Sequence, residues 1–235
     1  MANSLCGVFK EIADILREKI GILEKIAANE FPEKIDYIKN KDLFTEIATG
    51  AVEHIKACEL EGLIEISSYA FVGCNNLISV DLPSSIISIG EYAFDNCNKL
   101  ESVAISDGLT SIGSRAFSSC SNLKSIVLPN SVISIGSSAF SSCSNLESIV
   151  LSSSITSIGN HTFYSCSNLE SIILPNSVIS IGSSAFYFCS NLKSIVLPNS
   201  VISIGSSAFY SCSNLESIIL PDGLTSIGSN VFSYC

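Results

Sequence analysis

The sequence has few charged residues and no long uninterrupted apolar run. Charged side chains make up 14% of its 235 residues, and 12 Lys and Arg stand against 22 Asp and Glu, for a net charge of −10. A nucleic-acid partner requires clustered Lys and Arg, so the composition argues against one, and equally against an anionic membrane surface. No apolar run approaches about 18 residues, so no membrane-spanning helix is expected.

Motifs that carry catalysis or cofactor binding are also missing. There is no phosphate-binding P-loop, no Gly-x-Gly-x-x-Gly, no His-Glu-x-x-His and no Cys-x-x-Cys pair. The two histidines are His54 and His161, and His161 takes a place that is serine in other copies of the repeat described below. We therefore expect no metal, no cofactor and no enzymatic activity.

The N-terminus carries no basic segment followed by an apolar stretch, since Lys10, Glu11 and Asp14 interrupt the apolar residues there. A secretory signal is thus not visible. The expectation is a cytoplasmic or particle-associated protein, unless a leader has been removed or export follows another route, in which case the cell surface becomes the expected location.

What the sequence does contain is the motif Phe-x-x-Cys, repeated eight times at a fixed interval of 23 residues. A period of this length is typical of a solenoid, in which each unit buries its apolar side by stacking on its neighbours. The phenylalanines are Phe71, Phe94, Phe117, Phe140, Phe163, Phe186, Phe209 and Phe232, and the cysteines run from Cys74 to Cys235.

Each copy begins with the pattern Leu-x-x-Ile-x-Leu, as at 123–128. Its β-branched residues predict a strand whose named side chains point inward, and Pro129 ends that strand because proline cannot donate to a ladder. A second, shorter apolar run containing Ile133 and Ile135 is closed by Gly136, which indicates either a positive φ or a close backbone contact.

The rest of each copy predicts a turn. Residues 137–142 are expected to form one turn of α- or 3₁₀-helix that places Ala139 and Phe140 inside. Asn145 precedes the next leucine, and its amide is expected to bond the backbone of the turn. The eight in-phase cysteines are interpreted as a column of buried, reduced thiols, because side chains that project in parallel leave their Cβ atoms about 4.8 Å apart, too far for a disulfide.

With Ile-Gly-x-x-Ala-Phe-x-x-Cys in nearly every copy, residues 60–235 resemble the BspA-like leucine-rich repeats. The resemblance implies an α/β solenoid: a curved, right-handed coil with a parallel sheet on its concave side and a role in adhesion or surface binding. Seven stacked strands would make a sheet roughly 30–35 Å long.

Residues 1–41 lack the 23-residue pattern and are assigned to a helical N-terminal segment, with residues 42–235 as the solenoid. Apolar residues at helical spacing follow Ser4 as far as Gly21, and a second helix is expected over 30–39. The segment is similar to a short helical module of bacterial and phage tail-associated proteins, so it either caps the first repeat or docks the chain to a larger assembly. A first strand is expected over 52–58.

Two expectations concern binding. The outward strand positions form a candidate ligand surface with an apolar stripe beside a row of charges. This surface comprises Lys124, Val127, Glu147, Val150, Glu170, Ile173, Lys193, Val196, Glu216 and Ile219. The alternative is that β-branched residues stand there only because strands favour them.

The function expected is a binding or adhesion module for a protein, a cell-surface ligand or a repetitive ligand; a phage-tail assembly subunit docked through the N-terminal helices and an intracellular scaffold remain alternatives. The last strand, near 218–220, is expected to be an uncapped edge that permits self-association.

Overall fold

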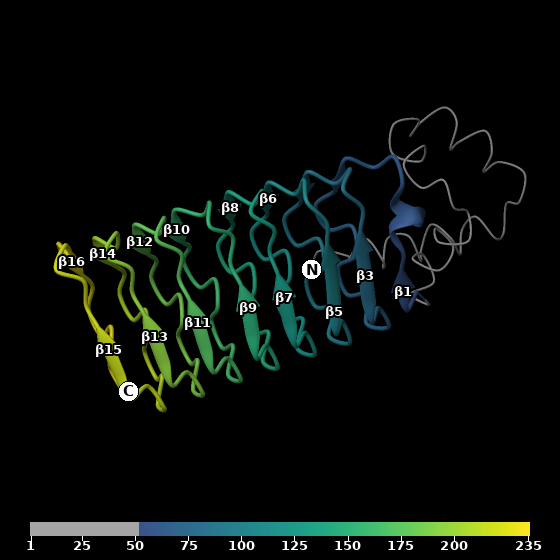
Figure 1. Cartoon of the computed structure of the whole chain (residues 1–235). Helices are drawn as coiled ribbons and strands as arrows, with labels where there is room; N and C mark the ends of the chain where they lie inside the picture. Colours follow the sequence, from purple (N-terminus) through teal and green to yellow (C-terminus); the bar gives the residue numbers. More distant parts are fainter. Residues whose placement is uncertain (1–51) are drawn as a thin grey trace, which may run out of the picture.

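The structure, a computed structural model, describes residues 52–235, which form a β-solenoid of parallel strands (Figure 1). Each turn of the coil contributes one strand to each of two rows. The first row holds β1 (His54–Ile55), β3 (Ser79–Leu82), β5 (Ser102–Ile105), β7 (Ser125–Val127), β9 (Ser148–Val150), β11 (Ser171–Ile173), β13 (Ser194–Val196) and β15 (Ser217–Ile219). The second row holds two-residue strands: β2 (Glu65–Ile66), β4 (Ser88–Ile89), β6 (Ser111–Ile112), β8 (Ser134–Ile135), β10 (Ser157–Ile158), β12 (Ser180–Ile181), β14 (Ser203–Ile204) and β16 (Ser226–Ile227).

Strands of successive copies pair in parallel with a register of 23 residues, as Ser171 does with Ser194, except that β1 pairs with β3 at a register of 25. The first row consists of three ladders, β1-β3-β5, β7-β9 and β11-β13-β15, rather than the single continuous sheet that was expected. The second row is interrupted between β8 and β10. At that point Thr162 replaces the alanine of neighbouring copies, and the Phe140 and Phe163 ring centroids reach 5.8 Å, the widest spacing in their stack.

The phenylalanine column is the spine of the core, as the repeat predicts. Successive rings stack nearly parallel with centroids 5.1 to 5.8 Å apart, and the central rings are fully buried. The inward leucine and the inward Ile or Val of the first-row strands from β3 to β13 are buried beside them, as Leu123 and Ile126 show. In the last copy, Leu215 and Ile218 are half-buried. The inward half of the strand pattern is thus confirmed.

Residues 137–142 form turns, so the expected helical turn is wrong. Ser138 and Ser142 have φ values of 58° and 61°, which no α- or 3₁₀-helix contains. Their backbone N–H groups, and that of Phe140 between them, donate to carbonyls of the next copy at 2.7 to 3.0 Å. These bonds between copies replace the helical ones, while Ala139 and Phe140 still point inward, as expected.

The α/β class also needs correction, because residues 52–235 contain no α-helix and a single 3₁₀-helix, η1 (Ala57–Leu60). A strand was expected over 52–58, but only the two residues of β1 are extended, and η1 begins at Ala57. Within the described part of the chain, no helix is long and apolar enough to cross a membrane. The helical N-terminal segment predicted over 1–41 lies outside the described residues.

The recurring glycine is required by a close contact, one of the two explanations that the sequence allowed. A Cβ built on Gly136 would lie 2.4 Å from the backbone nitrogen of Ser114 in the preceding copy. Gly136 does not adopt a positive φ. Glycine therefore sets how closely neighbouring turns approach at this corner.

Candidate binding surface

Five large apolar side chains stand in a row on the outside of the first row of strands, and we call them the ridge. Each follows an inward-pointing isoleucine, which is buried in four copies and half-buried at Ile218, so the alternation of the strand turns it outward. The exposed fraction is 60% for Val127, 56% for Val150, 82% for Ile173, 70% for Val196 and 79% for Ile219. At about 4.8 Å per strand, the ridge is about 20 Å long. The predicted outward orientation is confirmed, and the binding role remains a prediction.

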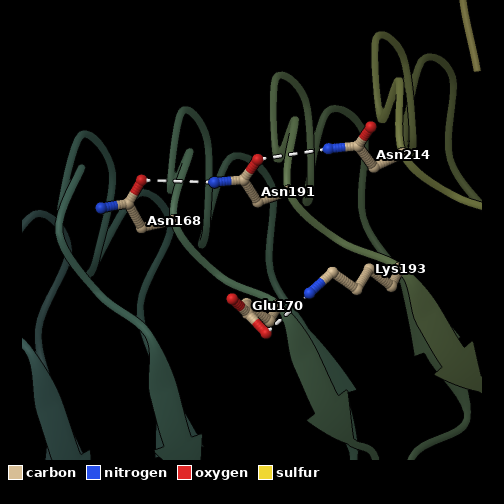
Figure 2. A network of polar contacts seen from close by, with 5 residues as sticks. All are labelled: Asn168, Glu170, Asn191, Lys193 and Asn214. Atoms are coloured by element: carbon tan, nitrogen blue, oxygen red, sulfur yellow. Dashed lines mark hydrogen bonds and ion pairs between the residues drawn. The ribbon is translucent and has the colours of Figure 1, made fainter.

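A row of charged residues precedes the ridge, one residue at the start of each strand. Lys124 Nζ lies 3.3 Å from Glu101 Oε2, and Lys193 Nζ lies 3.0 Å from Glu170 Oε2 (Figure 2). All four side chains are about half exposed or more, and exposed ion pairs contribute only about 0–1 kcal/mol. A partner can therefore recruit these charges at little cost in stability.

The remaining predicted charges, Glu147 and Glu216, are also exposed on this margin. Glu216 and Lys193 line a shallow hollow of about 450 Å³ together with Asn214. The structure thus places all ten predicted residues along one face of the solenoid, with the charged margin beside the ridge.

The asparagine column forms a ladder of side chains, which corrects the expected amide-to-backbone bond. Each amide nitrogen donates to the amide oxygen of the preceding copy at 3.2 to 3.4 Å (Figure 2). An amide carries both donor and acceptor, so identical residues one turn apart satisfy each other. The ladder contains Asn122, Asn145, Asn168, Asn191 and Asn214.

The cysteine column is buried from Cys74 to Cys212, as expected, but Cys235 is exposed, so the expectation fails for the last member. Each thiol from Cys97 onward donates to the carbonyl of the phenylalanine 26 residues earlier, at 2.9 to 3.2 Å. Burial raises the pKa of the Cys143 thiol to about 12. The thiols are therefore poor nucleophiles that link successive copies.

A second exposed apolar column lies immediately before the two-residue strands, one residue ahead of each, and sequence reasoning missed it. In the short run at 132–135, Val132 is buried while Ile133 is 61% exposed. The equivalent positions alternate between Ile and Thr, a mixture that signals an exposed site. The exposed isoleucines are Ile64, Ile87, Ile133, Ile179 and Ile202, and the threonines are Thr110, Thr156 and Thr225.

Among residues 52–235, no group of three or more His, Cys, Asp and Glu is placed to hold a metal ion. The features that remain are a regular coil, an exposed ridge and a charged margin. Parallel strands, two in each 23-residue turn, with leucine and isoleucine inside, define a leucine-rich repeat solenoid.

Comparison with known proteins gives the family. The sequence profile of the BspA type leucine rich repeat region matches in six copies over residues 23–133, 49–170 and 110–235. The chain therefore belongs to the BspA-type leucine-rich repeat family, and the resemblance noted in the sequence is confirmed. A search of curated proteins gave no match.

Solved structures agree with this assignment. A leucine-rich repeat protein from Bacteroides ovatus is 34% identical, with a TM-score of 0.72 over 77% of this chain and 46% of its own. The T. pallidum leucine-rich repeat protein is 36% identical, with a TM-score of 0.57 over 79% of this chain and 78% of its own. One from Eubacterium ventriosum, 20% identical with a TM-score of 0.64 over 78% of this chain and 62% of its own, shows the fold alone. The chain thus spans less than half the length of the B. ovatus protein.

Proposed function

We propose that this chain is a non-catalytic binding or adhesion module that presents the ridge and its charged margin to a protein or a repetitive ligand. One observation carries the proposal: five consecutive copies expose Val or Ile at more than half of their surface. Large apolar side chains in a contiguous row, bordered by polar residues, are typical of an interaction site.

The regularity of this face supports a repetitive ligand. The strands read Ser-Ile-Val or Ser-Ile-Ile in five successive copies, with Lys or Glu before each serine. A surface fitted to one irregular epitope would vary from copy to copy. A ligand with a short translational repeat makes the same contact at every strand and gains avidity from the repetition.

The alternative of an assembly subunit depends on residues 1–41, which lie outside the described part, and it stays a prediction. Self-association through the last turn also stays a prediction.

Three substitutions test the ridge: Val150→Thr, Ile173→Thr and Val196→Thr in one protein. Threonine remains β-branched, so the strands should form, while the apolar contact is lost. A matched control carries Ile133→Thr and Ile179→Thr in the second apolar column, where three other copies already have threonine. Binding of fluorescently labelled protein to intact cells is measured by flow cytometry, and self-association by light scattering.

We expect the ridge variant to lose the cell binding or association that the wild type shows, and the control to keep it. Circular dichroism should show the same folded spectrum for all three proteins. Equal binding by wild type and ridge variant would mean that the β-branched residues serve only the strands. An equal loss of binding in the ridge variant and the control would mean that binding depends on general surface hydrophobicity rather than on the ridge.

A further inference from the structure

A cluster of aromatic side chains lies in the C-terminal half, on the turns one or two residues after the phenylalanines of the core column. Tyr164 and Tyr187 stack with centroids 5.1 Å apart, and Tyr187 and Tyr210 stack at 4.5 Å. Phe188 stands nearly perpendicular to Tyr187, at 85° and 4.7 Å, and Tyr234 lies 5.0 Å from Tyr210. We call these five residues the aromatic cluster.

Two members of the cluster stand on left-handed backbone. Phe188 and Tyr234 have φ values of 58° and 63°, and the same place in other copies is held by glycine, asparagine or serine. Left-handed backbone costs a residue with a Cβ about 1–2 kcal/mol. Phe188 is nevertheless 45% exposed, so burial offsets little of that cost. A bulky ring held exposed on such backbone indicates a use at the surface.

The cluster borders a hollow of about 480 Å³ that is lined entirely by uncharged residues. The lining residues are Tyr187, Phe188, Ser190, Tyr210, Ser211, Ser213 and Tyr234. They combine aromatic surface with six hydroxyl groups. The hydroxyls of Ser190 and Ser213 donate to the backbone carbonyls of Ser167 and Ser190, so these two are left as acceptors for a ligand. The pKa of Tyr210 is raised from its ordinary value, first by partial desolvation and then by the neighbouring Tyr234 hydroxyl.

We propose that the aromatic cluster is a second binding site, which takes an uncharged oligosaccharide. A pyranose ring has an apolar face of C–H groups that suits the negative face of Phe188, and a rim of hydroxyls that suits the tyrosines and serines. A charged sugar or an acidic peptide would find no counter-ion in this lining. A proline-rich peptide also docks on aromatic grooves, but its backbone offers mainly acceptors, a poorer match to this set of hydroxyls.

The chain supplies its own reporter for the test. It has no tryptophan, and four of its seven tyrosines belong to the cluster, so ligand binding should change tyrosine emission. The full chain is titrated with maltohexaose, cellohexaose and chitohexaose, and calorimetry measures the same affinities independently. We expect a saturable response to at least one of them.

Phe188→Ser installs the residue that other copies have at this place, and should preserve the fold while lowering the affinity about tenfold or more. Tyr92→Ser is the matched control. Tyr92 is also a stacked tyrosine, with a φ of 55°, but it lies outside the cluster at a position where other copies have serine, so its substitution should leave the affinity unchanged.

The proposal is overturned if none of the three oligosaccharides gives a saturable response, or if Phe188→Ser binds as wild type does. It also fails if Tyr92→Ser lowers the affinity equally, or if a proline-rich decapeptide binds while the oligosaccharides do not. The ridge variant should retain oligosaccharide binding. The proposal for this site and the proposal for the ridge are therefore tested independently.

Discussion

Alkaline pH should destabilise the fold through its buried cysteines, and Cys143 offers the clearest test. The side chain is fully buried, and that burial raises the pKa of its thiol to about 12. In an unfolded chain the cysteine pKa is about 8.5. Because the folded pKa is the higher one, the contribution of this thiol to stability is complete below about pH 8.5 and is lost as the pH rises toward 12.

The size of the effect follows from linkage between protonation and folding. At pH 10 the thiol of the unfolded chain is almost fully ionised, while that of the folded chain keeps its proton. The free energy of unfolding should then be about 2 kcal/mol lower at pH 10 than at pH 7 for this group alone. Burial also raises the pKa of Cys120, Cys166, Cys189 and Cys212, so the whole chain should lose more than this single group accounts for.

The assay compares wild type with Cys143→Ala by urea denaturation at pH 7 and pH 10, followed by circular dichroism. At pH 7 the variant should be less stable by about 1–2 kcal/mol, because it lacks the packed sulfur and its bond to the Phe117 carbonyl. At pH 10 that deficit should shrink by about 2 kcal/mol, since alanine has no proton to lose. Val132→Ala, at a buried site without a titrating group, should show the same deficit at both values.

A Cys143→Ala deficit that stays constant between pH 7 and pH 10 would refute the reasoning. It would mean that the thiol ionises equally in the folded and unfolded chains, and hence that the column is open to solvent.

Two further substitutions test the core and the close contact between turns. Phe140→Ala should lower the free energy of unfolding by about 3–5 kcal/mol, because the ring is fully buried between two others; a melting temperature within a degree or two of wild type would contradict the stack. Gly136→Ala should cost about 1–3 kcal/mol, because its Cβ would meet the backbone of Ser114, whereas Gly159→Ala meets the Thr162 hydroxyl at 3.2 Å and should be better tolerated. Equal losses for the two glycine variants in urea titration would contradict this explanation.

Much of the fold could be read from the repeat, because its signals are local and recur in phase. The 23-residue period predicted the solenoid, and the alternation around Ile126 and Val127 predicted which side chain points in and which out. The ten residues of the candidate surface follow from the same alternation. Their position on one face was predictable for this reason, whereas the alternation does not identify the ligand.

Other features depend on the neighbouring copy and could not be read from one. The segment around Phe140 has the composition of a helical turn, yet its N–H groups bond the next turn and the helix does not form. The amide of Asn145 donates a hydrogen bond to the amide oxygen of Asn122 instead of bonding the backbone of its own turn. The aromatic cluster was also missed, because Phe188 is out of phase with the repeat and its significance lies in its backbone conformation and its neighbours.

The sequence by itself thus determined the architecture, the composition of the core and the orientation of the strand side chains, because each rests on a periodicity within one chain segment. The tertiary structure decided the close approach at Gly136, the thiol and amide ladders, the interruption near Thr162 and the exposed rings of the aromatic cluster. These depend on the distance and register between successive turns, which are fixed only when the turns stack.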